Sequence, residues 1–215
     1  MKKPAGPAGK INRPSALTQL AARNRTFRRF DENQRVAKST LRSLVNLARL
    51  SPSGGNLQPL KFMLLNNPRH NALVFPCLAW AGYFPDWPGP AAGERPAAYI
   101  LILGDTAIRK DFGCDHGIAA QSIMLGAAEA GLGGCIIGSI NRPRLRRALR
   151  LPARYEILLA LALGRPRETV ILETARRGAI KYWRDDQARH HVPKRPLNEI
   201  ILSVAPHNLW ATNPT

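Results

Sequence analysis

Two short basic segments, far apart in the chain, have the composition of a phosphate-binding site. Arg25 and Arg28 are three residues apart with Thr26 beside Arg25, and they would share one face if this segment were helical. Two guanidinium groups and a hydroxyl can bind a phosphate monoester through charge-assisted hydrogen bonds. Lys194 and Arg195 lie between two prolines, which reduce the entropy lost in positioning them. Solvated basic patches are the alternative interpretation of both segments.

The segment 51–59, SPSGGNLQP, has the composition of a loop that can approach a ligand closely. Pro52 stops the preceding helix, and Ser53 and Gly54 have little or no side chain to keep a ligand away. Asn56, with the glutamine two residues later, supplies both hydrogen-bond donors and acceptors. The alternative is a helix-to-strand turn that needs glycine and asparagine for left-handed conformations.

The glycines at 131–134, GLGG, follow a helix rich in small residues and precede a strand. Gly133 and Gly134 would allow close backbone contact with a flat ring. The motif is weak as a phosphate loop, because its glycines follow a helix instead of opening one. The alternative is an ordinary helix end and turn, for which Gly131 is suited.

Other side chains with possible chemistry are not arranged for catalysis. His190 and His191 are adjacent, and no third metal ligand follows at a suitable spacing, so no metal site is predicted. Asp115 and His116 come without a nucleophile pattern, and Asp115 is interpreted as a helix cap. The sequence shows no triad, no paired carboxylates and no G-x-G-x-x-G after a strand. No catalytic side chain is therefore identified.

The elements that must position these residues mix helices and strands. Helices are predicted at 15–24, 38–50, 115–130, 143–150 and 197–204, and strands at 60–65, 98–103, 135–138 and 157–163. Helix 38–50 has an apolar stripe that includes Leu41, Leu44 and Ala48, and Ser39 or Thr40 is expected to cap it. Segment 66–97, with six prolines and five aromatic residues, and the chain from 164 to 196 are interpreted as irregular.

Length and charge narrow the class of protein. The 215 residues predict one domain, 15–215, after a disordered basic leader at 1–14. The net charge of +18 keeps nucleic-acid binding as an alternative, but no nucleic-acid motif accompanies the charge. The longest apolar run is far shorter than the roughly 20 residues of a membrane span, and the basic N-terminus lacks an apolar stretch. Three cysteines without C-x-x-C spacing favour buried thiols in a cytoplasmic protein.

Five segments, in this order, resemble the nitroreductase family of FMN-dependent oxidoreductases over most of the chain, from about residue 25 to 201. The matching segments are Arg25-Thr26-Phe27-Arg28-Arg29-Phe30, Ser51 to Pro59, the helix pattern from Asp115 to Gly133, Gly164-Arg165-Pro166 and Lys194-Arg195. Three positions depart from the family pattern: Thr26 replaces a serine, Ser51 stands at an alanine position, and Leu60 stands where an aromatic residue is common.

The resemblance implies an α+β fold, with a mixed, mostly antiparallel sheet flanked by helices, in an entwined homodimer. Each FMN would draw on both chains and take reducing equivalents from NAD(P)H for a nitroaromatic, quinone or related conjugated acceptor. The implied cofactor-binding residues are Arg25, Thr26, Arg28, Lys194 and Arg195 at the phosphate and ribityl ends, Pro52, Ser53, Gly54 and Asn56 from the partner chain, and Gly133 and Gly134 near the isoalloxazine. The flavin would carry the hydride chemistry, so no catalytic side chain is required.

Segment 66–97 does not resemble the common members closely, so the acceptor is not carried over from the family. Tyr83 and Phe84, together with Trp80 and Trp87, are candidates for a wall over the flavin that contacts the substrate. The alternative is that these rings fill a secondary core beneath a long loop. A flavin-binding protein with another task, such as dehydrogenation or flavin handling, is the second candidate function, and a nucleic-acid-associated protein is the third.

Overall fold

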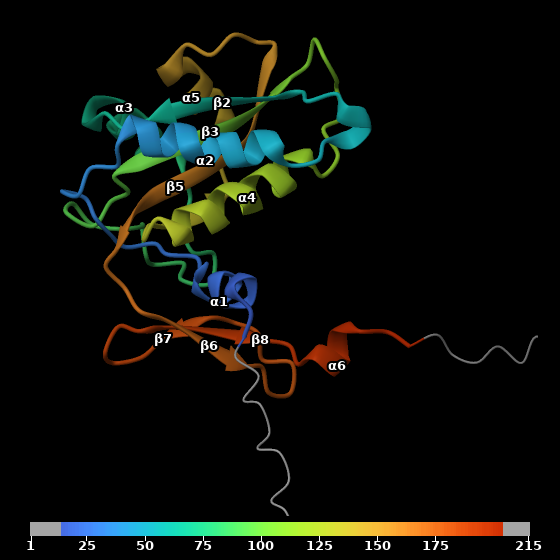
Figure 1. The fold of residues 1–215 in the computed structure, drawn as a ribbon. Coiled ribbons are helices and arrows are strands. Elements are labelled where there is room, and N and C mark those ends of the chain that lie inside the picture. The colour runs from blue at the N-terminus through green and yellow to red at the C-terminus, as the bar shows by residue number, and fades with distance from the viewer. Residues whose placement is uncertain (1–13, 204–215) are drawn as a thin grey trace, which may run out of the picture. The chain divides into compact units, whose positions relative to one another are not determined.

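The computed structural model describes residues 14–203, which form two compact units, 14–168 and 169–203 (Figure 1). The expected leader at 1–14 lies outside the described residues, except for Pro14. Among the described residues, no helix is long and apolar enough to cross a membrane. Cys77 and Cys135 are buried free thiols as expected, whereas Cys114 is exposed, which corrects the expectation for that residue.

The first unit is built on an antiparallel sheet, in the order β1-β5-β3-β2, with β4 also paired to β5. The strands are β1 (Phe30–Asp31), β2 (Leu60–Leu65), β3 (Ala98–Asp105), β4 (Gly133–Ile137) and β5 (Tyr155–Pro166). Strand β3 is central and buried along its whole length, because helices cover both faces of the sheet. The expected α+β fold with a mostly antiparallel sheet flanked by helices is confirmed.

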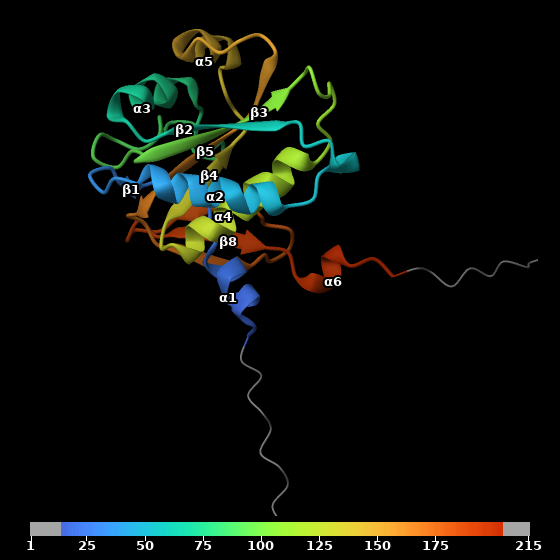
Figure 2. The same ribbon diagram turned by 45° about the horizontal axis from the view of Figure 1, so that its top comes forward.

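Alternate residues of β3 belong to two cores, one on each face of the sheet. Ile100 and Ile102 pack with α2 (Lys38–Leu50) and α4 (Asp115–Glu129), which lie side by side on one face (Figure 1). Tyr99 and Leu101 pack on the face covered by α3 (Pro68–Val74) and α5 (Arg142–Leu149), which Figure 2 shows on the opposite side. This alternation follows from the two-residue period of a strand.

Two helices differ from their predictions in informative ways. Helix α2 has the predicted bounds and buries Leu41, Leu44 and Ala48, but its N-cap is Ala37 without a side-chain hydrogen bond. Helix α3 interrupts the segment predicted to be irregular. Asn67 caps it by accepting from the Arg69 backbone N–H, and proline stands at its start, which is a standard helix opening. Helix α1 (Ala16–Arg23) begins after Ser15 as expected.

The second unit contains a small sheet where the sequence predicted irregular chain. Its order is β6-β8-β7, with β6 (Val170–Thr174) parallel to β8 (His190–Lys194) and β7 (Trp183–Arg184) antiparallel to β8. The terminal helix α6 (Leu197–Ile200) is shorter than the predicted 197–204, whose last residue lies outside the described part.

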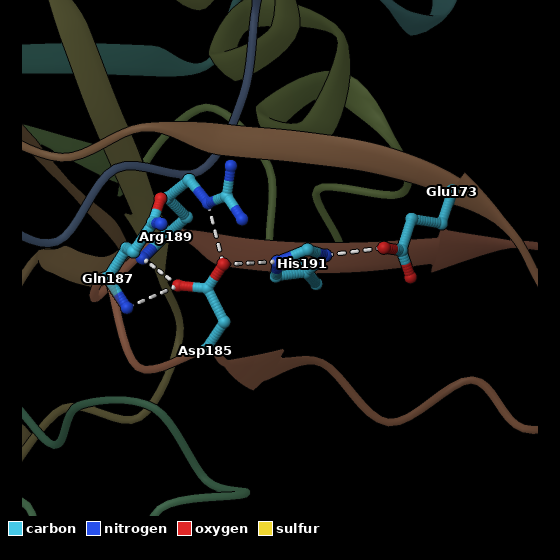
Figure 3. Close-up of polar contacts among 5 residues, drawn as sticks. All are labelled: Glu173, Asp185, Gln187, Arg189 and His191. Atoms are coloured by element: carbon cyan, nitrogen blue, oxygen red, sulfur yellow. Dashed lines mark hydrogen bonds and ion pairs between the residues drawn. The ribbon is translucent and has the colours of Figure 1, made fainter.

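The imidazole of His191, in β8, contacts two carboxylates of the second unit (Figure 3). Its Nδ1 contacts Glu173 of β6, and its Nε2 lies 3.2 Å from Oδ2 of Asp185, which also accepts from Arg189 at 2.6 Å. The Trp183 ring stacks on the imidazole with centroids 4.0 Å apart. Ionised carboxylates only accept hydrogen bonds, so this arrangement favours the imidazolium, in which both ring nitrogens donate. Hydrogen bonds to Glu173 and Asp185 accordingly raise the pKa of His191.

We expect the small sheet to lose order as His191 loses its proton. Because its pKa in the folded chain is raised, its stabilising contribution is complete below the ordinary value near 6.5 and disappears as the pH rises through the raised value. Amide protection factors of β6 and β8 should therefore fall above neutral pH. The His191→Gln variant should show a flat profile and His70→Gln, at an exposed position, the original one. Identical profiles for His191→Gln and the unaltered protein would contradict this assignment.

Candidate functional site

The arginine segment lies in extended conformation beside the start of β4. Thr26 forms a parallel bridge with Gly134, and the Phe27 backbone N–H donates to the Gly134 carbonyl at 2.9 Å. The structure thus brings together two segments separated by more than a hundred residues. The segment is not helical, so helical spacing does not place Arg25 and Arg28 on one face.

Arg25 has a guanidinium donor available for an anion. Its Nη2 donates to the carbonyl of Ala21 in α1 at 2.5 Å, whereas Nε is buried without a hydrogen-bond partner among the described residues. Burial lowers the pKa of Arg25, although arginine stays charged at physiological pH. A phosphate oxygen is a chemically suitable partner for this donor, because the pairing would compensate both the charge and the unused N–H.

Backbone groups of the same segment are held by an acidic side chain. Glu168 Oε1 accepts hydrogen bonds from the backbone N–H groups of Arg28 and Arg29, the latter at 3.1 Å. The Arg29 carbonyl accepts from the backbone N–H of Arg167 at 2.9 Å. These contacts fix the course of the chain that carries Arg25 and Arg28.

Gly133 and Gly134 are required by packing inside the protein. A Cβ at Gly133 would lie 2.4 Å from Phe27 Cδ2 and 2.6 Å from Pro166 Cγ. A Cβ at Gly134 would lie 2.7 Å from the Ala162 carbonyl oxygen. The two glycines therefore have a structural reason of their own, and a flavin contact at either is an additional hypothesis. Gly131, with a φ of +73°, occupies the left-handed turn after α4, as expected.

The segment 51–58 is anchored to the first turn of α4 by Asp115. Ser53 Oγ donates to Asp115 Oδ2 at 2.6 Å, and the Gly54 backbone N–H donates to Oδ1 at 2.9 Å. The same Ser53 oxygen accepts from the Gln58 backbone N–H at 3.0 Å. Cys114, without a side-chain bond, takes the N-cap position expected for Asp115, so the capping prediction for Asp115 is wrong.

Asp115 is 4% exposed and remains charged despite its burial. Burial alone would raise its pKa, but the hydrogen bonds from Ser53 and Gly54, with Arg109 and His116 nearby, outweigh that effect and lower it. Gly55 and Asn56 have φ values of 58° and 56°, so the left-handed conformations anticipated for this turn are present. Such conformations persist only where the surroundings enforce them.

A cavity of about 240 Å³ adjoins this loop. Pro52 and Ser53 line it together with Asp115, Lys61 and Arg49. Neither Tyr83 nor Phe84 borders it. The loop, the end of α2 and the start of α4 thus form a recess that combines apolar surface with cationic side chains and backbone of unusual conformation.

Lys194 and Arg195 belong to the second unit. Lys194 ends β8, and its carbonyl accepts from the Ala175 backbone N–H at 2.7 Å. Arg195 Nη1 lies 3.3 Å from Glu199 Oε2 of α6. Pro196 is the N-cap of α6, so the basic pair does connect two regular elements.

The aromatic residues of segment 66–97 divide into two groups. Trp80 is buried in the second core, where its ring centroid lies 5.8 Å from that of Phe75, and Trp87 packs against the same core. Tyr83 is 46% exposed and Phe84 is half-buried. Trp80 and Trp87 thus belong to the secondary core, which was the alternative interpretation. Tyr83 and Phe84 are at least partly accessible to solvent.

Sequence reasoning missed that two residues of the helix motif hold the 51–58 loop in place. Asp115, 62 positions from Ser53, anchors the loop, and Ser122 of α4 contacts the Ser51 hydroxyl at 2.7 Å. Such contacts join residues that are distant in the sequence, so no local sequence pattern indicates them. The described residues include no group of three or more His, Cys, Asp or Glu side chains suited to a metal ion.

Comparison with known proteins identifies the family to which these segments belong. The nitroreductase family matches residues 21–165, which include the Arg25 segment, the 51–58 loop and both glycines of β4. The chain therefore belongs to the nitroreductase family, as the sequence motifs indicated.

Three solved structures show the same fold at low sequence identity. An FMN-dependent nitroreductase from Clostridium difficile R20291 is 22% identical, with a TM-score of 0.59 over 74% of this chain and 91% of that chain. A nitroreductase family protein from Streptococcus pneumoniae TIGR4 is 18% identical, with a TM-score of 0.65 over 87% and 100% of the two chains. A protein from Exiguobacterium sibiricum 255-15, solved in complex with FMN, is 17% identical, with a TM-score of 0.60 over 72% and 90%.

Proposed function

We propose that the chain is an FMN-dependent oxidoreductase that passes reducing equivalents from NAD(P)H to a nitroaromatic, quinone or related conjugated acceptor. Family membership over residues 21–165 is the observation that carries the proposal. The FMN bound by the Exiguobacterium protein and the description of the Clostridium protein as FMN-dependent support the choice of cofactor. NAD(P)H as the electron donor, with NADP among the possibilities, follows from the family resemblance alone, and the cytoplasmic location follows from the three cysteines without C-x-x-C spacing.

The donor set around Arg25 fits the phosphate of FMN. Arg25, Thr26 and Arg28 would hold the phosphate and ribityl ends, and the buried unused Nε of Arg25 supports this role. Lys194 and Arg195 would add two cations. They lie beyond the range that the family matches, so their role rests on their resemblance to the family's C-terminal basic pair. Bound FMN supplies hydride transfer, while the protein positions the cofactor and its partners.

The two halves of the proposed site lie at opposite ends of α4. Ser53 and Gly54 contact its first residue, whereas Gly133 and Gly134 follow its last turn. A helix of 15 residues is about 22 Å long, so these groups are well separated within one chain. This separation supports a homodimer in which Pro52, Ser53, Gly54 and Asn56 of one chain complete the site of its partner.

The proposed homodimer is obligate for flavin binding, because one chain would supply only half of each site. Light scattering of the flavin-loaded protein at micromolar concentration should give twice the mass of the chain. A flavin-loaded monomer would disprove a shared site without affecting the proposed activity.

Tyr83 and Phe84 are proposed to contact the acceptor. Replacing both by alanine should lower kcat/KM for a flat acceptor by roughly five- to 150-fold, since each of the two aromatic contacts contributes about 0.5–1.5 kcal/mol. Flavin occupancy and the melting temperature should stay unchanged. Trp80→Ala is the contrasting variant: its ring is buried, so it should lower the melting temperature instead. Unchanged acceptor kinetics in the Tyr83 and Phe84 variant would remove these residues from the site.

The absorption spectrum of the purified protein tests the cofactor, and NAD(P)H turnover tests the reaction. We expect flavin bands, with FMN and not FAD released on denaturation. Bound flavin without NAD(P)H oxidation would favour the alternative of flavin handling or a specialised dehydrogenation. A colourless protein that takes up no added FMN would refute the proposal and favour the nucleic-acid alternative, which the +18 charge suggests.

A further inference from the structure

A second cavity, of about 380 Å³, lies on the opposite face of the sheet from α4. Residues that follow β1, helix α3 and the start of β3 surround it, and Figure 2 shows these elements at one end of the sheet. Its volume falls within the range of about 300–1,000 Å³ that is usual for small-molecule sites. It shares no lining residue with the cavity beside Ser53.

Three side chains bordering this cavity carry buried polar atoms without hydrogen-bond partners among the described residues. Tyr99, 0% exposed, has an unpartnered hydroxyl, and Asn71 Oδ1 and Arg95 Nε share this property. Buried polar groups are nearly always paired, with protein, water or ligand. Because all three residues line one cavity, a single polar ligand that enters it and turns these side chains towards itself would pair all three atoms.

The chemistry of the three atoms specifies that partner. Arg95 Nε–H needs an acceptor, whereas Asn71 Oδ1 needs a donor, because the Asn71 amide nitrogen already donates to the Ala97 carbonyl at 2.8 Å. Burial, and then the charge of Glu32, raise the pKa of Tyr99, so its phenol stays protonated and can donate. A partner with both an acceptor and a donor is required.

The charges of the lining favour an anion held in a fixed orientation. Arg35 and Arg95 outweigh Glu32 among the lining residues. Glu32 is positioned by the Gly93 backbone N–H, which donates to Oε2 at 2.6 Å, and the Arg95 guanidinium lies over the Phe75 ring at 4.4 Å. Two cations and one anion suit a carboxylate with an adjacent donor, which Glu32 can attract if the donor is an amine.

We propose that this cavity binds a small α-amino or α-hydroxy carboxylate. The carboxylate meets Arg95 and the Tyr99 hydroxyl, and the amino or hydroxyl group donates to Asn71 Oδ1. The site is separate from the proposed flavin site, so binding does not depend on the proposed function being correct.

Isothermal titration of the full-length protein, as purified, with L-serine and with glycerate tests the proposal. At least one should bind saturably with one site per chain, and acetate and glycerol should bind at least tenfold more weakly, because each lacks one of the two required groups. A preference for serine identifies Glu32 as a partner of the amine, and a preference for glycerate identifies a hydroxyl ligand. No saturable binding of either acid at millimolar concentration would overturn the proposal.

Variants distinguish a ligand from ordered water as the partner of the three buried polar atoms. Tyr99→Phe should weaken binding several-fold to tenfold without lowering the melting temperature, because the hydroxyl has no hydrogen-bond partner among residues 14–203. Arg95→Met should weaken it tenfold or more, since a charge-assisted bond is lost. Tyr155→Phe, away from this cavity, is the matched control and should bind normally. Binding unaffected by both variants, or a lower melting temperature of Tyr99→Phe with unchanged binding, would refute the site.

Discussion

The Arg25→Ala variant is expected to bind FMN at least tenfold more weakly than the unaltered protein. The buried Nε–H of Arg25 is unpartnered in the described part of the chain, and a hydrogen bond from a charged donor contributes about 1.5–3 kcal/mol. Fluorescence titration of FMN into apoprotein gives the dissociation constant directly. Arg23→Ala is the matched control, because Arg23 is an exposed arginine two residues away, at the end of α1.

Arg195→Ala extends the same test to the second unit. A loss of tenfold or more would assign Arg195 to the phosphate, even though its guanidinium lies near Glu199 in the structure. If Arg25→Ala and Arg195→Ala both keep full flavin after dialysis, the phosphate assignment is wrong. If Arg25→Ala alone loses flavin, only the first-unit residues hold the phosphate.

Asp115→Ala is expected to cost about 2–4 kcal/mol of the free energy of unfolding. The substitution leaves the Ser53 hydroxyl and the Gly54 backbone N–H without their acceptor, at about 1–3 kcal/mol for each group. For a chain of this size, the melting temperature should fall by about 5–15 °C. Glu129→Ala, at the exposed end of the same helix, should change it little.

The pH dependence of stability checks the same residue. Because the pKa of Asp115 is lowered in the folded chain, its contribution is complete above about pH 4 and is lost as the pH falls through the lowered value. Unfolding free energies of Asp115→Ala and the unaltered protein should therefore converge in acid. A constant difference down to low pH would contradict a role for the carboxylate charge.

The first unit was largely predictable because its elements carry strong local patterns. The stripe of Leu41, Leu44 and Ala48 fixed α2, and the apolar run of β3 marked a strand covered on both faces. Helix α3 had a readable signal as well, since Asn67 precedes Pro68, but the many prolines nearby outweighed it. The small sheet was missed because it depends on parallel pairing of β6 with β8, which no local pattern records.

The motifs of the candidate site could be recognised in the sequence, but the residues that anchor them could not. Residues of the Arg25 segment and of β4 meet through the bridge between Thr26 and Gly134. The anchoring of Ser53 by Asp115 could not be read from the sequence, because it joins residues 62 positions apart. The unpartnered hydroxyl of Tyr99 is equally invisible in a sequence, where the residue looks like part of an apolar strand.

Most of the acidic residues of this chain accept hydrogen bonds within the described fold. Among the described residues, at least nine of the fourteen accept hydrogen bonds: Asp31, Glu32, Asp105, Asp111, Asp115, Glu168, Glu173, Asp185 and Glu199. Those carboxylates neutralise local donors, and the 32 lysines and arginines greatly outnumber the rest. Mutual repulsion among exposed cations is screened by dissolved ions, over about 10 Å at 0.1 M. Raising the ionic strength should therefore stabilise the folded protein, and its stability should be lowest in dilute buffer.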